Sequence, residues 1–261
     1  MGKVYHLDLE KKDIQGAEVV LMPGDPARSP LIAAAVAKAY GSSFSVVASK
    51  REFTTCITEV MGEKILVTST GIGGPSTSIA VDELAQLGVK TFIRVGTTGA
   101  IQERIKNGDC VITTGSVRLD GASTHYAPIE YPAVADFSLV AALAKGARKA
   151  GVNYHLGITA SSDTFYPGEE RTDSFMKYKL RRFRGATEEW RALNVLNYEM
   201  ESSTLLTVTS ALGLKGACIT GVVNRGSTGK ITPQLLKAGT NSAVRAAVAS
   251  LEFVIMGQGL L

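Results

Sequence analysis

The chain has 261 residues, of which 45% are hydrophobic, so it is long enough to bury one large core. Its 28 basic and 24 acidic residues leave a net charge of +4. So small an excess permits an anionic small-molecule substrate but gives no indication of nucleic-acid binding. No stretch approaches the length of a transmembrane helix, so we expect no membrane span.

The cysteines and the first residues are typical of a cytoplasmic protein. Cys56, Cys110 and Cys218 lie far apart and form no C-x-x-C pair, which fits a reducing compartment and predicts no zinc site. Each lies in an apolar or β-like run, so we interpret all three as buried structural thiols. Residues 1–13 lack the apolar segment of a secretory signal.

Strand-like runs alternate with helical patterns along the chain. Strands are predicted at 18–24, 64–70, 91–99, 109–119, 154–162 and 215–223. Helices are predicted at 31–40, 77–88, 195–213 and 233–254. This alternation predicts an α/β fold with a central, largely parallel or mixed twisted sheet that is flanked by helices. We find no linker, repeat or low-complexity segment, so we expect residues 1–261 to form a single domain.

Three glycine-rich loops each follow or end a predicted strand: PGDPAR (23–28), GIGGPSTS (71–78) and RVGTTGA (94–100). None matches a P-loop or a dinucleotide fingerprint, which excludes a dinucleotide-binding oxidoreductase. Glycine lets the backbone approach a ligand closely, and Arg28 and Arg94 offer two-pronged recognition of phosphate. Tight turns with solvated arginines would also explain the loops. That reading is weaker for Arg94, because a charge inside an apolar strand needs a partner.

Two carboxylates flank a methionine in NYEMES (197–202), within an otherwise apolar stretch. A carboxylate can accept hydrogen bonds from both hydroxyls of a ribose diol, which would compensate its burial. Glu199 or Glu201 can equally cap the helix that follows. Spacing alone does not decide between these two roles.

A polar loop follows the strand at 154–162. In TFYPGEERTD (164–173) the pair Pro167–Gly168 marks a turn. Phe165 lies on one side of this turn, and Glu169 and Arg171 lie on the other. An aromatic face beside a polar edge is suited to a flat ring with polar edges.

Taken together, these stretches resemble the nucleoside phosphorylase-I family, and in particular its bacterial uridine-cleaving members. The resemblance runs from about Val4 to Arg225 and fades beyond it. The segments that carry it are PGDPAR, REFTT, STGIGGPSTSIAVDELAQLG, RVGTTGAIQ, SVRLDGAS, TASSDTFYPG, EEW, NYEMES and VVNR.

The resemblance implies reversible phosphorolysis, in which uridine and phosphate give uracil and ribose 1-phosphate. It implies no cofactor for the chemistry, and an assembly of three dimers into a hexamer whose active sites are shared across each dimer interface. It also implies a structural potassium ion at that interface. The expected partners are therefore a nucleoside, inorganic phosphate and further copies of the chain.

The resemblance also assigns residues to each part of the substrate. The phosphate ligands would be Gly24, Arg28, Arg51, Arg94 and Thr97. The ribose ligands would be His6, Met200 and Glu201, with His6 and Arg51 reaching in from the neighbouring subunit. The base ligands would be Phe165, Glu169, Arg171 and Arg225, and the potassium ligands Glu52, Ile72 and Ser76. Catalysis would rest on Arg94, Arg171 and Glu201, because Arg171 can stabilise negative charge on the departing base. Replacing Arg94 by alanine is expected to impair phosphate use and leave the fold unchanged.

Three departures from the family pattern affect the base and the lid. Glu169 replaces a glutamine that reads the uracil edge in the family. The segment before Arg225 is one residue shorter, and residues 226–232 replace the usual lid sequence. Base choice, deoxyribose tolerance and the level of activity therefore stay open.

Two alternatives remain. A purine-directed phosphorylase or nucleosidase would carry an aspartate after the last strand, and ITGVVNR (219–225) contains no acid. A nucleoside-binding homologue with weakened catalysis would not need a phosphate site, yet the arginines of such a site are present.

Overall fold

The computed structural model describes residues 2–226 and 229–257. Its strands are β1 (Val19–Met22), β2 (Phe44–Lys50), β3 (Phe53–Val60), β4 (Glu63–Thr68), β5 (Thr91–Ala100), β6 (Cys110–Leu119), β7 (Ala133–Val134), β8 (Tyr154–Ser162), β9 (Asn197–Glu199) and β10 (Lys215–Arg225). Its α-helices are α1 (Arg28–Tyr40), α2 (Gly74–Leu87), α3 (Phe137–Lys149), α4 (Ala186–Ala192), α5 (Ser202–Ala211) and α6 (Pro233–Ile255).

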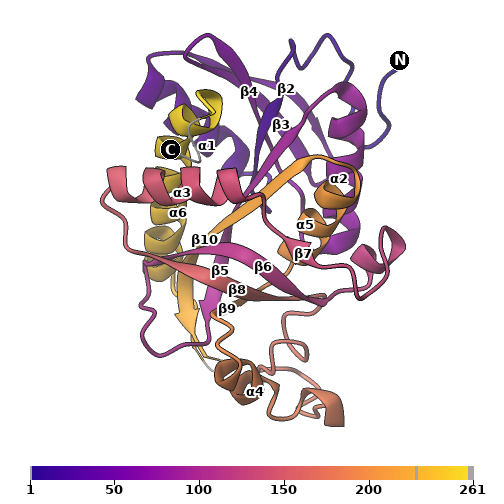
Figure 1. Ribbon diagram of the computed structural model, residues 1–261, viewed down its shortest axis with the longest axis vertical. Helices are drawn as coiled ribbons and strands as arrows, with labels where there is room; N and C mark the ends of the chain where they lie inside the picture. The colour runs from indigo at the N-terminus through magenta and orange to yellow at the C-terminus, as the bar shows by residue number, and fades with distance from the viewer. Residues whose placement is uncertain (1, 227–228, 258–261) are drawn as a thin grey trace.

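All ten strands of the described residues belong to one mixed sheet, with β5 at its centre (Figure 1). β5 pairs in parallel with β1 and β10 and antiparallel with β9. β10, β6, β8 and β9 continue from strand to strand and return to β5, so these five strands close a ring. β1, β4, β3 and β2 extend the sheet on the other side of β5. The predicted α/β class with a mixed sheet is thus confirmed.

Helices cover both faces of the sheet and separate two apolar cores. α1, α3 and α6 pack on one face, and α2 and α5 pack on the other (Figure 1). Successive side chains of a strand point to opposite faces of the sheet. Ile93 therefore lies in the core under α1, α3 and α6, and Phe92 in the core under α2 and α5. Arg94, the fourth residue of β5, points to the same face as Phe92, on which α5 packs.

The C-terminal helix lies directly on the backbone of β10. A Cβ atom at Gly221 would come 1.8 Å from the carbonyl oxygen of Gly239 in α6, and a Cβ at Gly239 would come 2.8 Å from the carbonyl oxygen of Val222. Both positions therefore need glycine for this close approach. The contact fixes α6 against β10 close to Val223 and Asn224.

The structure differs from the sequence-based elements in several places, and the short elements β7 and α4 are among those not predicted. The hairpin of β2 and β3 and the helix α3 were not predicted. The predicted helix at 195–213 is a short strand, β9, followed by α5. Within the described residues, the helices are all too short or too polar to span a bilayer.

Candidate active site

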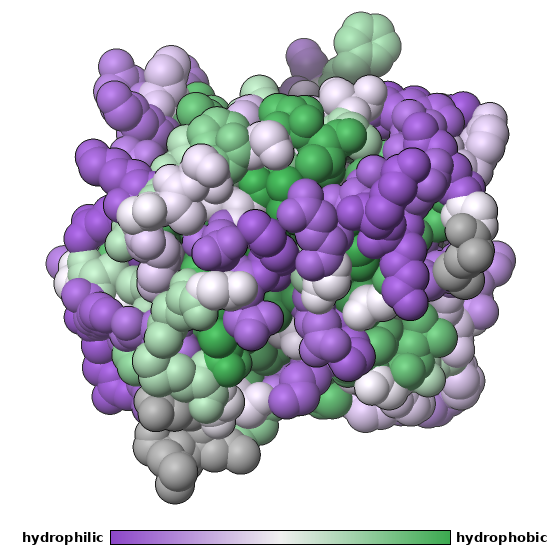
Figure 2. Space-filling model, turned by 90° about the horizontal axis from the view of Figure 1, so that it is seen from above, coloured by the Kyte–Doolittle hydropathy of each residue, from purple (hydrophilic) through white to green (hydrophobic). Residues whose placement is uncertain are grey.

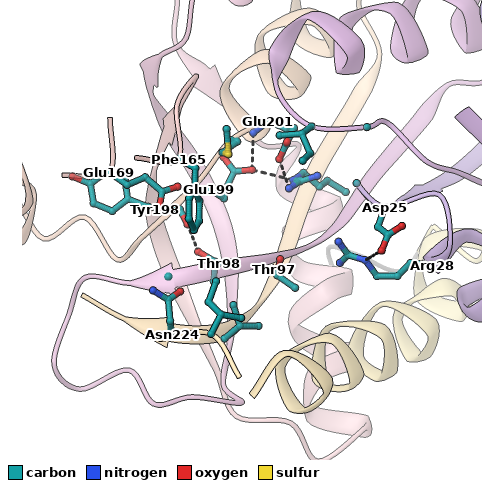
Figure 3. A pocket seen from close by; sticks show the side chains of 18 of the residues that line it. Asp25, Arg28, Thr97, Thr98, Phe165, Glu169, Tyr198, Glu199, Glu201 and Asn224 are labelled. Carbon is teal, nitrogen blue, oxygen red and sulfur yellow. Dashed lines mark hydrogen bonds and ion pairs between the residues drawn. The ribbon is translucent and has the colours of Figure 1, made fainter. Parts of the chain in front are cut away.

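A pocket of about 650 Å³ opens at the carboxyl ends of the parallel strands. The loop after β1 supplies Gly24 and Arg28, and β5 supplies Arg94 and Thr97. The other walls come from the 164–173 loop, from the segment that joins β9 to α5, and from the end of β10. Figure 3 shows Arg28 at one end of the pocket, Glu169 and Phe165 at the other, and Glu201 between them.

A buried charge network forms the centre of the pocket. Arg94 Nε donates to Glu199 at 3.0 Å, and its Nη2 pairs with Glu201. Burial alone would lower the pKa of Arg94, but the two carboxylates reverse this and raise it. Arg94 Nη1 is buried and has no hydrogen-bond partner in the described part of the chain. One donor of this guanidinium thus remains available to a ligand.

The two carboxylates of NYEMES have different roles. Glu199 accepts from the backbone N–H groups of Glu201 and Ser202 at 2.9 Å and from the Ser202 hydroxyl at 2.6 Å, so it satisfies the start of α5. Glu201 accepts from the Gly73 N–H at 2.6 Å and lines the pocket. Burial raises the pKa of Glu201, and Arg94 opposes that rise. Glu199 therefore has the capping role, and the diol-binding role stays a prediction for Glu201.

Two arginines meet at the Gly24 end of the pocket. A Cβ at Gly24 would lie 3.3 Å from the Gly71 carbonyl oxygen, 3.9 Å from Arg94 Nη1 and 4.0 Å from Arg28 Nη2, so both guanidinium groups lie close to the Gly24 backbone. Burial lowers the pKa of Arg28, and the positive charge of Arg94 lowers it further. Asp25, at 4.0 Å from Arg28, is the acid that pairs with it. Two neighbouring cations that line the same pocket favour an anionic ligand.

The opposite end of the pocket carries an aromatic ring and a buried acid. Phe165 and Glu169 line the pocket, and only 8% of Glu169 is exposed. Burial raises the pKa of Glu169 to about 8; Arg171 opposes the shift, and Glu199 and Glu201 add to it. Arg171 itself is not part of the pocket wall. Its guanidinium lies 4.5 Å from the centre of the Phe165 ring and pairs with Asp173 at 2.8–2.9 Å.

Five predicted site residues lie outside the pocket wall of this chain: Arg171, described above, and Ser76, Arg225, His6 and Arg51. Arg225 donates to the Glu103 carbonyl at 2.6 Å on the surface. His6 is held by Glu83, with its Nδ1 2.6 Å from the carboxylate. Arg51 is exposed at the turn between β2 and β3, with a left-handed φ of 55°. The N-terminal segment and this turn are adjacent, since Lys50 Nζ donates to the Tyr5 carbonyl at 2.5 Å.

The predicted potassium ligands gather around Gly71. A Cβ at Gly71 would lie 2.8 Å from Glu52 Cγ and 3.3 Å from Ser76 Oγ. Ser76 Oγ also donates to the Ile72 carbonyl at 3.2 Å. A carboxylate, a hydroxyl and a carbonyl are the oxygen ligands that a hard cation takes, so these residues fit such an ion. Glu52 and Ile72 also line the pocket.

The pocket includes residues that sequence reasoning did not select. Thr98 donates to the Tyr198 carbonyl at 2.5 Å, which joins β5 to β9. Asn224 is buried on the pocket wall, against the glycine backbone of β5 at Gly99. Asn224 is the asparagine of the VVNR segment. Only the neighbouring Arg225 was selected there, because of its charge.

The Tyr198 hydroxyl is buried and lacks a hydrogen-bond partner among the described residues. By contrast, the Tyr40 hydroxyl donates to the Val248 carbonyl at 2.9 Å. We expect Tyr40→Phe to lower the free energy of unfolding by about 1 kcal/mol. Tyr198→Phe should lower it by less, because the Tyr198 hydroxyl has only a weak contact with the Thr187 side chain to lose. Urea denaturation of both variants tests this pair, and an equal loss in both would contradict it.

An α/β protein with this pocket belongs to the class that binds small molecules at the carboxyl ends of parallel strands. Residues 18–255 match the family model described as the phosphorylase superfamily. The chain belongs to this family.

Several curated proteins are similar over most of their length. The uridine phosphorylases of Salmonella typhimurium and Escherichia coli are each 55% identical over 220 residues, which is 84% of this chain and 85% of each relative. The uridine phosphorylase of Thermococcus kodakarensis is 41% identical over 253 residues, 97% of this chain and 87% of the relative. The guanosine phosphorylase of Halorubrum lacusprofundi is 34% identical over 219 residues, 84% of this chain and 82% of the relative.

Proposed function

We propose that this protein is a uridine phosphorylase, a pentosyltransferase that converts uridine and phosphate reversibly to uracil and ribose 1-phosphate. The relatives of that name at 55% identity support the proposal. The observation that carries it is that Arg28 and Arg94 both line the pocket beside Gly24. A protein that only bound a nucleoside would not need this paired cationic site. Salvage of pyrimidine nucleosides in the cytoplasm is the corresponding role.

The order of groups along the pocket supports a pose for the substrates. Phosphate binds at Gly24, Arg28, Arg94 and Thr97, where the free Nη1 of Arg94 donates to it. Ribose lies between the two ends, with its diol on Glu201 and one face on Met200. The base lies against Phe165 and Glu169.

The chemistry that this pose supports needs no covalent nucleophile. As the glycosidic bond breaks, positive charge develops on the sugar, and the phosphate dianion held by the arginines stabilises it. Negative charge develops on the departing base, and the cation of Arg171 behind Phe165 faces that charge. Holding phosphate, sugar and base together supplies the proximity effect. Glu199 keeps Arg94 in place by its 3.0 Å bond.

The site is completed by a second copy of the chain in this proposal. His6 and Arg51 lie outside their own pocket but close to one another, on the segment and turn that reach into the partner's pocket. Exposed hydrophobic residues, including Tyr5, Phe44, Val46 and Ile72, lie on or near these segments. Figure 2 shows hydrophobic patches among hydrophilic residues on the face of the molecule seen from above. Three such dimers would form a hexamer, with a potassium ion bound by Glu52, Ile72 and Ser76 at each dimer interface.

Subunit mixing tests the shared site. When His6→Ala and Glu201→Ala proteins are mixed and reassembled, each mixed dimer has one intact site and one doubly altered site. About a quarter of the wild-type activity should return, because half of the dimers are mixed and each retains half of its sites. Either variant alone should have little activity. Mixtures that are no more active than the separate variants would contradict a shared site.

The function itself is tested by uracil release from uridine with and without inorganic phosphate. Phosphate-dependent release, with ribose 1-phosphate as the second product, is expected. Release that does not need phosphate would identify a nucleosidase instead. No release from uridine, thymidine, cytidine, inosine or guanosine would identify a binding protein.

A further inference from the structure

The base end of the pocket contains one acid whose environment is unusual. The Glu169 side chain lines the pocket, 8% of the residue is exposed, and its carboxyl group forms no hydrogen bond with any other described residue. The neighbouring Glu170 is different, because its carboxylate accepts from the N–H groups of Gly185 and Thr187 at 2.8 and 3.0 Å. A buried carboxyl group without a partner is costly unless a ligand satisfies it or the group is neutral.

The charges around Glu169 do not favour its ionised form. The nearest cation, Arg171, is already engaged by both oxygens of Asp173. On the facing segment, the carboxylates of Glu199 and Glu201 repel a negative charge at Glu169, although both pair with Arg94. The titratable groups that face Glu169 are thus Arg171, Asp173, Tyr198, Glu199 and Glu201, together with Arg94 behind the last two.

We propose that Glu169 determines the base specificity of this site, and that it binds the base as a neutral carboxylic acid. This inference rests on the proposed function. A neutral acid has one O–H donor and one carbonyl acceptor. It can therefore accept from the ring N–H of an imide such as uracil and donate to the adjacent carbonyl. The pKa of about 8 means that this form is the main one at neutral pH.

Ionisation of Glu169 would remove this match. A carboxylate only accepts, so its second oxygen would face the carbonyl of uracil, acceptor against acceptor. An ionised Glu169 would instead suit a base edge with two adjacent donors, such as that of guanine. The protonation state of a single side chain therefore separates two classes of base, and uracil-type bases are the class that the neutral acid selects.

The first test compares the pH dependence of kcat/KM for uridine in the wild type and in Glu169→Gln, whose amide keeps one donor and one acceptor at every pH. Taking the ratio of the two proteins cancels the ionisation of phosphate and of uridine. The kcat/KM of the wild type, divided by that of the variant, should fall about tenfold for each pH unit above the pKa of Glu169. Glu170→Gln is the matched control and should retain the wild-type profile, because Glu170 lies outside the pocket wall.

The second test measures proton uptake when uracil binds, by calorimetry in two buffers of different ionisation enthalpy. Above the pKa of Glu169, the wild type should take up nearly one proton per uracil bound, and Glu169→Gln should take up none. A pH-independent kinetic ratio or binding without proton uptake would overturn the inference. So would a wild-type preference for guanosine that Glu169→Gln reverses, since this would assign the ionised form. Failure of both proteins to release uracil at any pH would instead contradict the proposed function.

Discussion

Replacing Arg94 by alanine is expected to remove most of the activity and also to destabilise the protein. The change deletes a phosphate ligand, which should lower kcat/KM by about 10²–10³. It also leaves Glu199 and Glu201 buried without their cation, which should lower the free energy of unfolding by about 3–5 kcal/mol. The sequence-based expectation that the fold would be unchanged did not include these two partners. Phosphate kinetics and urea denaturation measure the two effects separately.

Two further variants separate the causes. Arg28→Ala should impair phosphate use with a stability change below about 1 kcal/mol, because the partner of Arg28 is a half-exposed Asp25 at 4.0 Å. Adding Glu201→Gln to Arg94→Ala should restore part of the lost stability, since it removes one of the unpaired charges. Wild-type stability and wild-type phosphate kinetics in Arg94→Ala would show that the network has neither role.

The second large effect is a pH-dependent gain in stability on replacing Glu169 by glutamine. The folded protein holds the Glu169 proton up to a pKa of about 8, whereas the unfolded chain releases it near 4.5. Because the folded-state pKa is the higher one, the contribution of Glu169 to wild-type stability is greatest below pH 4.5 and declines as pH rises towards 8. The decline is up to about 5 kcal/mol, at about 1.4 kcal/mol per pH unit. Glu169→Gln does not lose this stability. Its free energy of unfolding should therefore increasingly exceed that of the wild type as pH rises from 4.5 towards 8.

Urea denaturation at a series of pH values and one fixed protomer concentration measures this gain, because assembly would otherwise change the apparent stability. Glu170→Gln should behave in the opposite way. Backbone N–H groups of Thr187 and Gly185 lower the pKa of Glu170 against the effect of burial. The Glu170→Gln variant should therefore have a lower free energy of unfolding than the wild type at neutral pH. This difference in free energy should shrink as pH falls. Parallel pH curves for Glu169→Gln and the wild type would refute the assigned ionisation.

The apolar pattern explains why the sequence predicts β5 and β10 and misses β2. β5 and β10 were predicted because continuous apolar runs are typical of buried parallel strands. β2 was missed because Phe44, Ser45 and Val46 are all exposed, so it lacks the alternation that marks a half-buried strand. The apolar run 195–199 was assigned to a helix, since a short apolar run does not distinguish a strand from a helix.

The candidate site was predictable where a residue lies in a motif and unpredictable where it depends on distant partners. The sequence-based set that lies on the pocket wall comprises Gly24, Arg28, Glu52, Ile72, Arg94, Thr97, Phe165, Glu169, Met200 and Glu201. The pairing of Arg94 with Glu199 joins residues 105 positions apart and has no local signal. The position of Arg171 behind Phe165, held by Asp173, likewise depends on how the loop folds.

The glycine contact between β10 and α6 makes the pocket sensitive to mutations that never touch a substrate. A methyl group at Gly221 or Gly239 would collide with backbone atoms, which cannot rotate away as a side chain can. The helix would have to lift from the strand, and Val223 and Asn224, which form part of the pocket wall, would move with it. A substitution at Gly239 in the C-terminal helix would therefore change the shape of the pocket, although this residue does not line it.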